Sequence, residues 1–385
     1  MAEPRETPPE DLQAARARRR ELLLNIAKAA GIVAALYFFL VGIQGIGASF
    51  ELFGSELANR ILVTTNNPIS GLFIGILATT LVQSSSTTTS IIVGMVAGGG
   101  ISLQGAIPMV MGANIGTTVT NTIVSVGHIT RVQEFKRAFA ASTVHDFFNL
   151  MAVIILFPLE YFFGIISRPA TVLAFTLDTA GGLKLADPLK LVVSPMVGFI
   201  EGAVGGSAWL LLIISVALTF YMLFSLVKIL RSLVLSKVEA FFDTYIFKTA
   251  LRGFGFGVVL TFLVQSSSIT TSLMVPLVGA GVLTLVQIFP YTIGANVGTT
   301  LTANIAAFST GNPYALSVSF AHLIFNLLGT LVIWPVPAVR RIPIRLAELM
   351  ARLAVRSKLI PLFYILIVFY LIPILVIVFE GGIHA

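Results

Sequence analysis

The sequence contains no cysteine and very little charge. The absence of cysteine excludes disulfide bonds and thiolate chemistry. Only 11% of the 385 residues are charged, whereas 56% are hydrophobic, and a soluble globular domain carries about 25% charged residues. This composition is typical of an integral membrane protein that crosses the bilayer several times.

Two long stretches lack every Asp, Glu, Lys and Arg: one between Arg60 and Arg131, the other between Arg252 and Arg340. They offer no carboxylate, amine or thiol for acid, base or nucleophilic chemistry, and a serine without a neighbouring base is a poor nucleophile. The sequence also contains no Walker motif for nucleotide binding. We therefore predict a protein that is not an enzyme, needs no cofactor and is not driven by ATP.

The net charge of +7 comes from basic clusters that lie between apolar segments, at 16–20, 131–137, 228–237 and 340–358. Cytoplasmic loops of membrane proteins carry such an excess of Lys and Arg. The pattern favours contact with a lipid bilayer over nucleic-acid binding. It predicts a multi-pass protein of the cell membrane with a cytoplasmic N-terminus.

The apolar segments predict an all-α polytopic fold. A span needs about 20 apolar residues, and seven segments qualify: 27–48, 103–126, 139–163, 207–230, 283–308, 315–338 and 359–379. Segments 50–67, 231–250 and 340–358 have the amphipathic pattern of interfacial helices, and 164–206 is expected to be an extracellular loop. Segments 69–98 and 253–280 are interrupted by Gly or Pro and too short to cross twice, so we predict two re-entrant hairpins.

An internal repeat connects the two hairpins. The octets QSSSTTTS, from Gln83, and QSSSITTS, from Gln265, match at seven of eight positions. The same spacing aligns GANIGTT, from Gly112, with GANVGTT, from Gly294, and a slightly shorter spacing aligns His145 with His322. The charge pattern makes the two hairpins enter from opposite sides, which predicts an inverted-topology repeat. The expected units are a tail 1–25, a first span and interfacial helix 26–68, repeat one 69–163, the loop 164–206, a span and interfacial helix 207–250, repeat two 251–338, and a last helix and span 339–385.

The polar residues of the repeats predict a site for an oxyanion and Na⁺. Helix N-termini and hydroxyl groups donate hydrogen bonds to oxyanions, and carbonyl, amide and hydroxyl oxygens suit a hard cation. Because no fixed cation is available, an anion would need a bound Na⁺ beside it, and this requirement would couple the two. The predicted anion ligands are Ser84, Ser85, Ser86, Thr87, Ser266, Ser267 and Ser268. The predicted Na⁺ ligands are Gln83, Gln265, Asn114, Thr117, Thr118, Asn296, Thr299 and Thr300.

Each motif also has a purely structural explanation. Clusters of Ser and Thr can hold helices together in a membrane. The GAN-x-GTT motif predicts a helix break with Na⁺ ligands, or alternatively a notch for close helix packing. His145 and His322, each followed by Asn four residues later, could form interhelical hydrogen bonds or have a gating or proton-linked role. Asp146 is either a functional intramembrane carboxylate or a member of a structural ion pair.

With the two QSSS motifs, GANIGTTVTNT, GANVGTTLT and STVHDFFN, the sequence resembles the type II sodium-dependent phosphate cotransporter family over about 25–380. The resemblance implies Na⁺-driven import of inorganic phosphate by alternating access, with phosphate and Na⁺ bound at Gln83–Ser86 and Gln265–Ser268. The 164–206 loop has no cysteine pair and no Asn-x-Ser/Thr sequon, which resembles bacterial members. Electrogenic members carry an Asp where this chain has Gly99, so the resemblance implies electroneutral transport of HPO₄²⁻ with two Na⁺.

Several alternatives stay open at this stage. The transported anion could instead be sulfate or a dicarboxylate, and the coupling ion could be H⁺ bound through the two histidines. A channel or a structural helix bundle is a different class of protein, and the paired hairpins argue against a simple bundle. The sequence leaves the oligomeric state undetermined, with a dimer among the alternatives.

Overall fold

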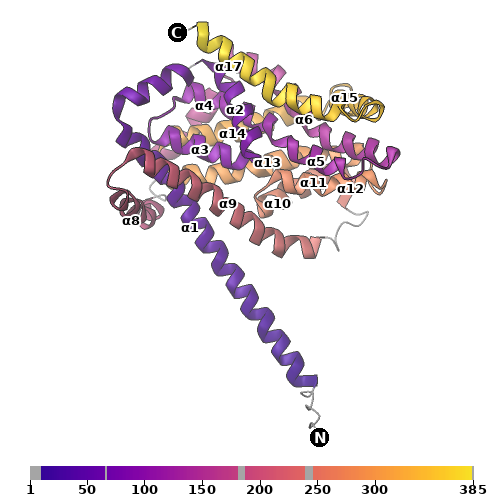
Figure 1. The fold of residues 1–385 in the computed structure, drawn as a ribbon, viewed down its shortest axis with the longest axis horizontal. Helices are drawn as coiled ribbons and strands as arrows, with labels where there is room; N and C mark the ends of the chain where they lie inside the picture. The colour runs from indigo at the N-terminus through magenta and orange to yellow at the C-terminus, as the bar shows by residue number, and fades with distance from the viewer. Residues whose placement is uncertain (1–9, 66, 181–186, 239–245, 384–385) are drawn as a thin grey trace.

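The computed structural model describes residues 10–65, 67–180, 187–238 and 246–383 of the chain. This part is built from helices without a β-strand, and it forms a layered bundle from which the N-terminal end of α1 projects (Figure 1). Five of its helices are long and apolar enough to cross a membrane: Arg18–Phe53, Val132–Phe163, Ala208–Ile229, Pro313–Ile333 and Ile360–Glu380. The predicted all-α polytopic fold is confirmed.

The helices follow one another with short connections. Their bounds are α1 Glu10–Thr65, α2 Pro68–Val82, α3 Ser85–Ala97, α4 Leu103–Ile115, α5 Val119–Val126, α6 Val132–Phe163, α7 Ser167–Thr179, α8 Asp187–Ala203, α9 Ala208–Val238, α10 Ala250–Val264, α11 Ser267–Ser272, α12 Met274–Gly279, α13 Leu285–Thr310, α14 Pro313–Ile333, α15 Pro337–Arg356, α16 Ile360–Ile365 and α17 Ile372–Ile383. Short 3-10 helices occupy Gly116–Thr118 and Ile246–Lys248, and a π-helix occupies Leu366–Leu371.

Both octets form the turn of a helical hairpin. The first hairpin consists of α2 and α3, and the second of α10 followed by α11 and α12. Each limb is at most 15 residues long, about 22 Å of helix, which is shorter than a bilayer core of about 30 Å. Their insertion into a membrane from opposite sides stays a prediction.

Two other expectations differ from the structure. Segment 164–206, expected to be an extracellular loop, contains helices α7 and α8, and α7 packs against α14; its extracellular position stays a prediction. Segment 50–67 is not a separate helix in the described chain, because α1 continues without interruption to Thr65. Segment 340–358 lies mostly in the amphipathic helix α15, as expected, and residues 239–245 of the segment 231–250 lie outside the described residues.

The GAN-x-GTT motif breaks a helix in one copy only. In the first copy a 3-10 turn at Gly116–Thr118 separates α4 from α5, whereas α13 runs unbroken through the second copy. The predicted break in the second copy is therefore wrong. Its glycines serve close packing: a Cβ added to Gly294 would lie 2.1 Å from the carbonyl oxygen of Phe254. Such an approach of α10 to α13 needs glycine but no unwinding of the helix.

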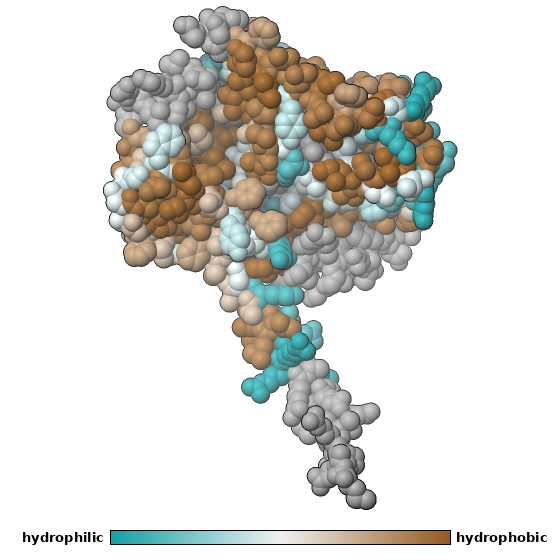
Figure 2. Space-filling model, viewed as in Figure 1, coloured by the Kyte–Doolittle hydropathy of each residue, from teal (hydrophilic) through white to brown (hydrophobic). Residues whose placement is uncertain are grey.

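The two copies make reciprocal contacts around a shared interior. Helix α2 packs on α4 as α10 packs on α13, and α3 contacts α13 and α14 while α12 contacts α5 and α6. The return limb of each hairpin therefore lies against the opposite copy. Among the residues that Figure 2 colours on this face of the bundle, hydrophobic side chains form large patches, as a surface that faces lipid requires.

Candidate functional site at the two hairpin tips

The same residue turns the chain at both tips. Gln83 and Gln265 each have φ 58 and ψ 24 and are the two non-glycine residues with positive φ in the described part of the chain. Glycine is the usual residue in this left-handed position after a helix. Glutamine adds a side-chain amide: Gln83 accepts a hydrogen bond from Thr120 (3.0 Å) and Gln265 accepts one from Thr302 (2.5 Å). These bonds tie each tip to the GAN-x-GTT helix of its own copy.

The serine after each glutamine starts the return helix. Ser84 and Ser266 have extended backbones, and their hydroxyl oxygens accept the backbone N–H of Thr87 (3.2 Å) and Ile269 (3.4 Å). Serine in this position satisfies one of the free N–H groups at a helix start. The octet sequence therefore encodes a turn and a helix N-terminus as well as a row of hydroxyl groups.

Several octet residues are buried, and their hydroxyl groups have no partner within the described part of the chain; Thr89 and Ser90 are two of them. Ser85, Ser86 and Ser267 have exposed fractions of 4%, 4% and 3%, and within the described part of the chain their side chains make no hydrogen bond. The hydroxyl group of Ser268, by contrast, donates to the carbonyl oxygen of Thr117 (3.3 Å). Buried hydroxyls normally have a partner, so those of Ser85, Ser86 and Ser267 are available to a bound ligand.

Both tips are bonded to the chain at the break between α4 and α5 or one turn beyond it. Thr117 in the break accepts the bond from Ser268 of the second tip, and Thr120, on the next turn, donates to Gln83 of the first tip. A further bond joins the copies, from the Asn121 amide to the Thr271 hydroxyl (2.9 Å). The structure therefore brings the two predicted groups of anion ligands together around one helix break.

Histidine and asparagine residues connect the two copies in a crossed pattern. His145 Nε2 bonds to Asn296 Oδ1, and His322 Nε2 lies 3.3 Å from Asn114 Oδ1. Because an amide oxygen only accepts, each histidine must carry its proton on Nε2. This arrangement is the interhelical hydrogen bond that was one of the two explanations for the histidines. It leaves each Nδ1 buried and without a partner in the described chain.

The asparagines four residues after the histidines extend this network. Asn149 donates to the Asn114 carbonyl oxygen (2.7 Å) and accepts from the Asn296 amide (2.6 Å). Asn326 donates to the Asn114 side-chain oxygen (3.3 Å) and to the His322 carbonyl oxygen (2.9 Å). Six buried side chains from both copies thus form one polar cluster.

The predicted Na⁺ ligands have different surroundings. The side-chain oxygens of Asn114 and Asn296 are engaged by the histidines. The hydroxyl groups of Thr117, Thr299 and Thr300 donate to carbonyl oxygens of their own helices (2.8–3.1 Å), which leaves their oxygen lone pairs available to a cation. The side chain of Thr118 lies outside the described residues. Within the described chain there is no cluster of His, Cys, Asp or Glu that could hold a metal ion.

Asp146 lies outside the tips. It is buried on α6 and accepts a hydrogen bond from the Tyr364 hydroxyl of α16 (2.9 Å). The bond ties the C-terminal helical segment to the first copy. This placement favours a structural role for the carboxylate over direct contact with a transported ion.

Sequence reasoning missed a pair of bonds that hold the far ends of the return limbs. Arg137 donates through Nε and Nη2 to the Gly279 carbonyl oxygen (2.9 and 2.7 Å), and Asn312 donates to the Ala97 carbonyl oxygen (3.1 Å). Gly279 and Ala97 occupy matching repeat positions, but Arg137 and Asn312 do not. No repeat signal could have identified them. Thr120 and Thr302, which do match, could have been found in this way.

A profile of the Na⁺/Pi-cotransporter family matches residues 38–168 and 218–334, more than half of the chain. The chain belongs to the Na⁺/Pi-cotransporter family. This confirms the resemblance seen in the sequence, and membership in a family of transporters agrees with the expectation that the protein is not an enzyme. No solved structure matches the chain.

Curated relatives within the Na⁺/Pi-cotransporter family are phosphate transport proteins of mammals. Sodium-dependent phosphate transport protein 2B of Pongo abelii and that of Homo sapiens are each 32% identical over 89% of this chain and 63% of their own length. Protein 2A of Ovis aries is 31% identical over 89% of this chain and 66% of its own length. The chain spans about 63% of the length of the first two relatives.

Proposed function

We propose that the chain is a secondary transporter that imports inorganic phosphate together with Na⁺ across the cell membrane. The observation that carries the proposal is the pair of hairpin tips, which are bonded to one region of the chain, the α4–α5 break and the following turn, through Ser268 and Gln83. Within these tips Ser85, Ser86 and Ser267 are buried residues whose hydroxyl groups make no hydrogen bond in the described chain. Hydroxyls and helix N-termini donate to oxyanions. The printed names of the relatives, sodium-dependent phosphate transport proteins, support phosphate as the anion and Na⁺ as the coupling ion.

Coupling follows from the absence of charge around the tips. Neither hairpin contains Lys or Arg beyond Arg252, near the start of α10. A phosphate dianion in this poorly hydrated interior would lack a fixed counter-charge, which is unfavourable by several kcal/mol. Bound Na⁺ supplies the missing charge, so each ion binds well only with the other. The hydroxyl oxygens of Thr117 and Thr299 and backbone carbonyl oxygens near the tips suit Na⁺.

The reciprocal contacts of the two copies support transport by alternating access. Each return limb packs on the opposite copy, and the end of each limb is bonded by one residue of that copy, Arg137 or Asn312. A movement that breaks the bond at the end of one return limb while the bond of the other limb remains would open the tips to one side of the membrane at a time.

Uptake into proteoliposomes tests the function. The full chain is reconstituted, and radiolabelled phosphate uptake is measured with an inward Na⁺ or K⁺ gradient, with the membrane voltage clamped at two values. We expect uptake with Na⁺ only, and inhibition by excess phosphate but not sulfate. Uptake driven by a proton gradient, or inhibited by sulfate, would contradict the proposed coupling ion or substrate. A flux that does not saturate would indicate a channel.

Comparing uptake at the two membrane voltages tests the number of Na⁺ ions transported with each phosphate. Gly99, where electrogenic members carry Asp, lies in the turn after α3 with φ +73, and a Cβ there would meet nothing within 4 Å. This chain therefore has no carboxylate at that position for a third Na⁺. Two Na⁺ and one HPO₄²⁻ carry no net charge, so uptake should be the same at both voltages.

Removing a free hydroxyl group should weaken phosphate binding. Ser85→Ala and Ser267→Ala each delete one donor to a desolvated anion, and we expect each to raise the phosphate KM by an amount equivalent to about 1–3 kcal/mol. Ser272→Ala is the matched control, because its hydroxyl group donates to the Ile269 carbonyl oxygen (2.8 Å) within the same hairpin. A wild-type phosphate KM in both tip variants would remove these serines from the site.

A further inference from the structure

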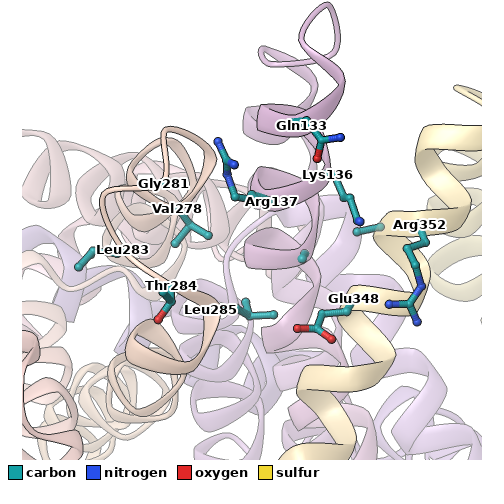
Figure 3. A pocket seen from close by; sticks show the side chains of 12 residues that line it. Gln133, Lys136, Arg137, Val278, Gly281, Leu283, Thr284, Leu285, Glu348 and Arg352 are labelled. Carbon is teal, nitrogen blue, oxygen red and sulfur yellow. The ribbon is translucent and has the colours of Figure 1, made fainter.

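A large open cavity is lined by residues other than those of the hairpin tips. Its volume is about 590 Å³, and it is bounded by α6, by the turn between α12 and α13, and by α15. Figure 3 shows the Lys136 side chain extending from α6 toward α15, with Arg352 and Glu348 on the facing helix. None of its lining residues belongs to the QSSS or GAN-x-GTT motifs.

The cavity wall carries three cations and one carboxylate. Arg137 is engaged with the Gly279 carbonyl oxygen through Nε and Nη2. Lys136 and Arg352 take part in no ion pair or hydrogen bond within the described part of the chain. Glu348 is the single acidic residue of the lining. The cavity therefore has an excess of positive charge, and two of its cations have no partner among the described residues.

We propose that this cavity binds a phosphate group, as a second site independent of the hairpin tips. A Lys ammonium and Arg guanidinium groups from two facing helices are the groups that proteins use to bind phosphate oxygens. The opposite charge of Glu348 weakens the site but does not cancel its cations. The cavity is much larger than a phosphate ion, so the group can be free phosphate or part of a larger molecule.

The position of the cavity connects it with the bilayer surface. Helix α15 is amphipathic, with five arginines and a buried face of Pro343, Ile344, Ala347, Ala351 and Ala354. Such helices lie at the membrane interface, and basic pockets between helices at this level take anionic lipid headgroups. The phosphate group therefore has two possible sources, a lipid headgroup or phosphate in solution. The proposal does not depend on transport.

Two binding measurements on the full chain in neutral detergent test the site. Binding of short-chain phosphatidylglycerol is titrated by native mass spectrometry. Binding of radiolabelled phosphate is measured by equilibrium dialysis without Na⁺, because the hairpin tips are proposed to bind phosphate only when Na⁺ is present. The test protein is the double variant Lys136→Gln with Arg352→Gln. The control is Arg341→Gln with Arg345→Gln, which removes the same charge from exposed positions of α15 outside the cavity.

We expect the dissociation constant of one of the two probes to rise at least about fivefold for each charge that the cavity variant removes. The control variant should bind both probes as the wild type does. Weaker phosphatidylglycerol binding identifies a lipid site, and weaker phosphate binding identifies a site for the free ion. Glu348→Gln removes the carboxylate and should strengthen binding of the same probe, which a general loss of folding could not produce. Unchanged binding of both probes by the cavity variant, or an equal loss in the control, would overturn the proposal.

Discussion

Replacing Gly257 by alanine is expected to destabilise the protein by about 3 kcal/mol. A Cβ at this position would lie 2.1 Å from the carbonyl oxygen of Tyr291 and 3.1 Å from the backbone nitrogen of Ala295. Both atoms belong to the backbone of α13, so no side chain can turn away, and α10 would have to move outward from α13. That movement would also displace the second hairpin tip, because Gln265 follows α10 directly.

Gly255 provides a control on the same helix. A Cβ there meets nothing within 4 Å, and alanine favours a helix over glycine by about 0.5–1 kcal/mol. Gly255→Ala should therefore leave the apparent melting temperature in detergent unchanged or raise it slightly, whereas Gly257→Ala should lower it and abolish uptake. Equal melting temperatures for the two variants would show that α10 and α13 do not pack as closely as described.

Asn296→Ala should have the second large effect, because it removes the centre of the polar cluster. The substitution leaves the Nε2 proton of His145 and the side-chain oxygen of Asn149 without partners in the buried interior. An unpaired buried polar group is unfavourable by about 1–3 kcal/mol. We expect a lower melting temperature, together with a higher Na⁺ concentration for half-maximal uptake, since the Thr299 hydroxyl group lies one turn away on the same helix.

Asn304→Ala is the matched control for this variant. Asn304 is also a buried asparagine of α13, but its side-chain oxygen has no partner and its side chain makes no hydrogen bond within the described chain. Its removal should change stability little. Asn114→Ala should resemble Asn296→Ala, because Asn114 accepts the reciprocal bond from His322. If Asn296→Ala behaved like Asn304→Ala, the crossed network would not be important for folding or coupling.

The sequence predicted the helical fold and the hairpin turns well, because both depend on local chemistry. Apolar segments of span length indicate helices without knowledge of their partners. At the first octet, α2 ends at Val82, Gln83 adopts the left-handed conformation, and Ser84 caps the start of α3. These three consecutive residues form the turn, so the turn is encoded locally. That these helix–turn–helix segments enter the membrane as re-entrant hairpins stays a prediction.

The errors concern features that depend on distant contacts. The glycines of GANVGTT were expected to unwind a helix, but α13 stays helical because the glycines face α10 and permit close packing. A sequence does not reveal which neighbour a glycine faces. Segment 164–206 has few apolar residues in succession, yet α7 becomes helical with Ala170 and Ala174 buried against a neighbouring helix. Within the site, the repeat indicated which residues matter, but not that Asn114 and Asn296 bond to histidines of the opposite copy.

The lack of ionisable side chains around the tips has a consequence for electrical measurements. A charge that crosses the whole membrane field contributes about 2.3 kcal/mol per 100 mV, so moving parts that carry Asp, Glu, Lys or Arg produce gating currents even when no substrate is present. From the middle of α10 to the end of α14, and from α2 to the end of α5, no such residue exists. Rearrangement of the two hairpin tips therefore moves no fixed charge of this kind, since Arg252 lies near the start of α10. Any current that accompanies their motion reports the ions they carry.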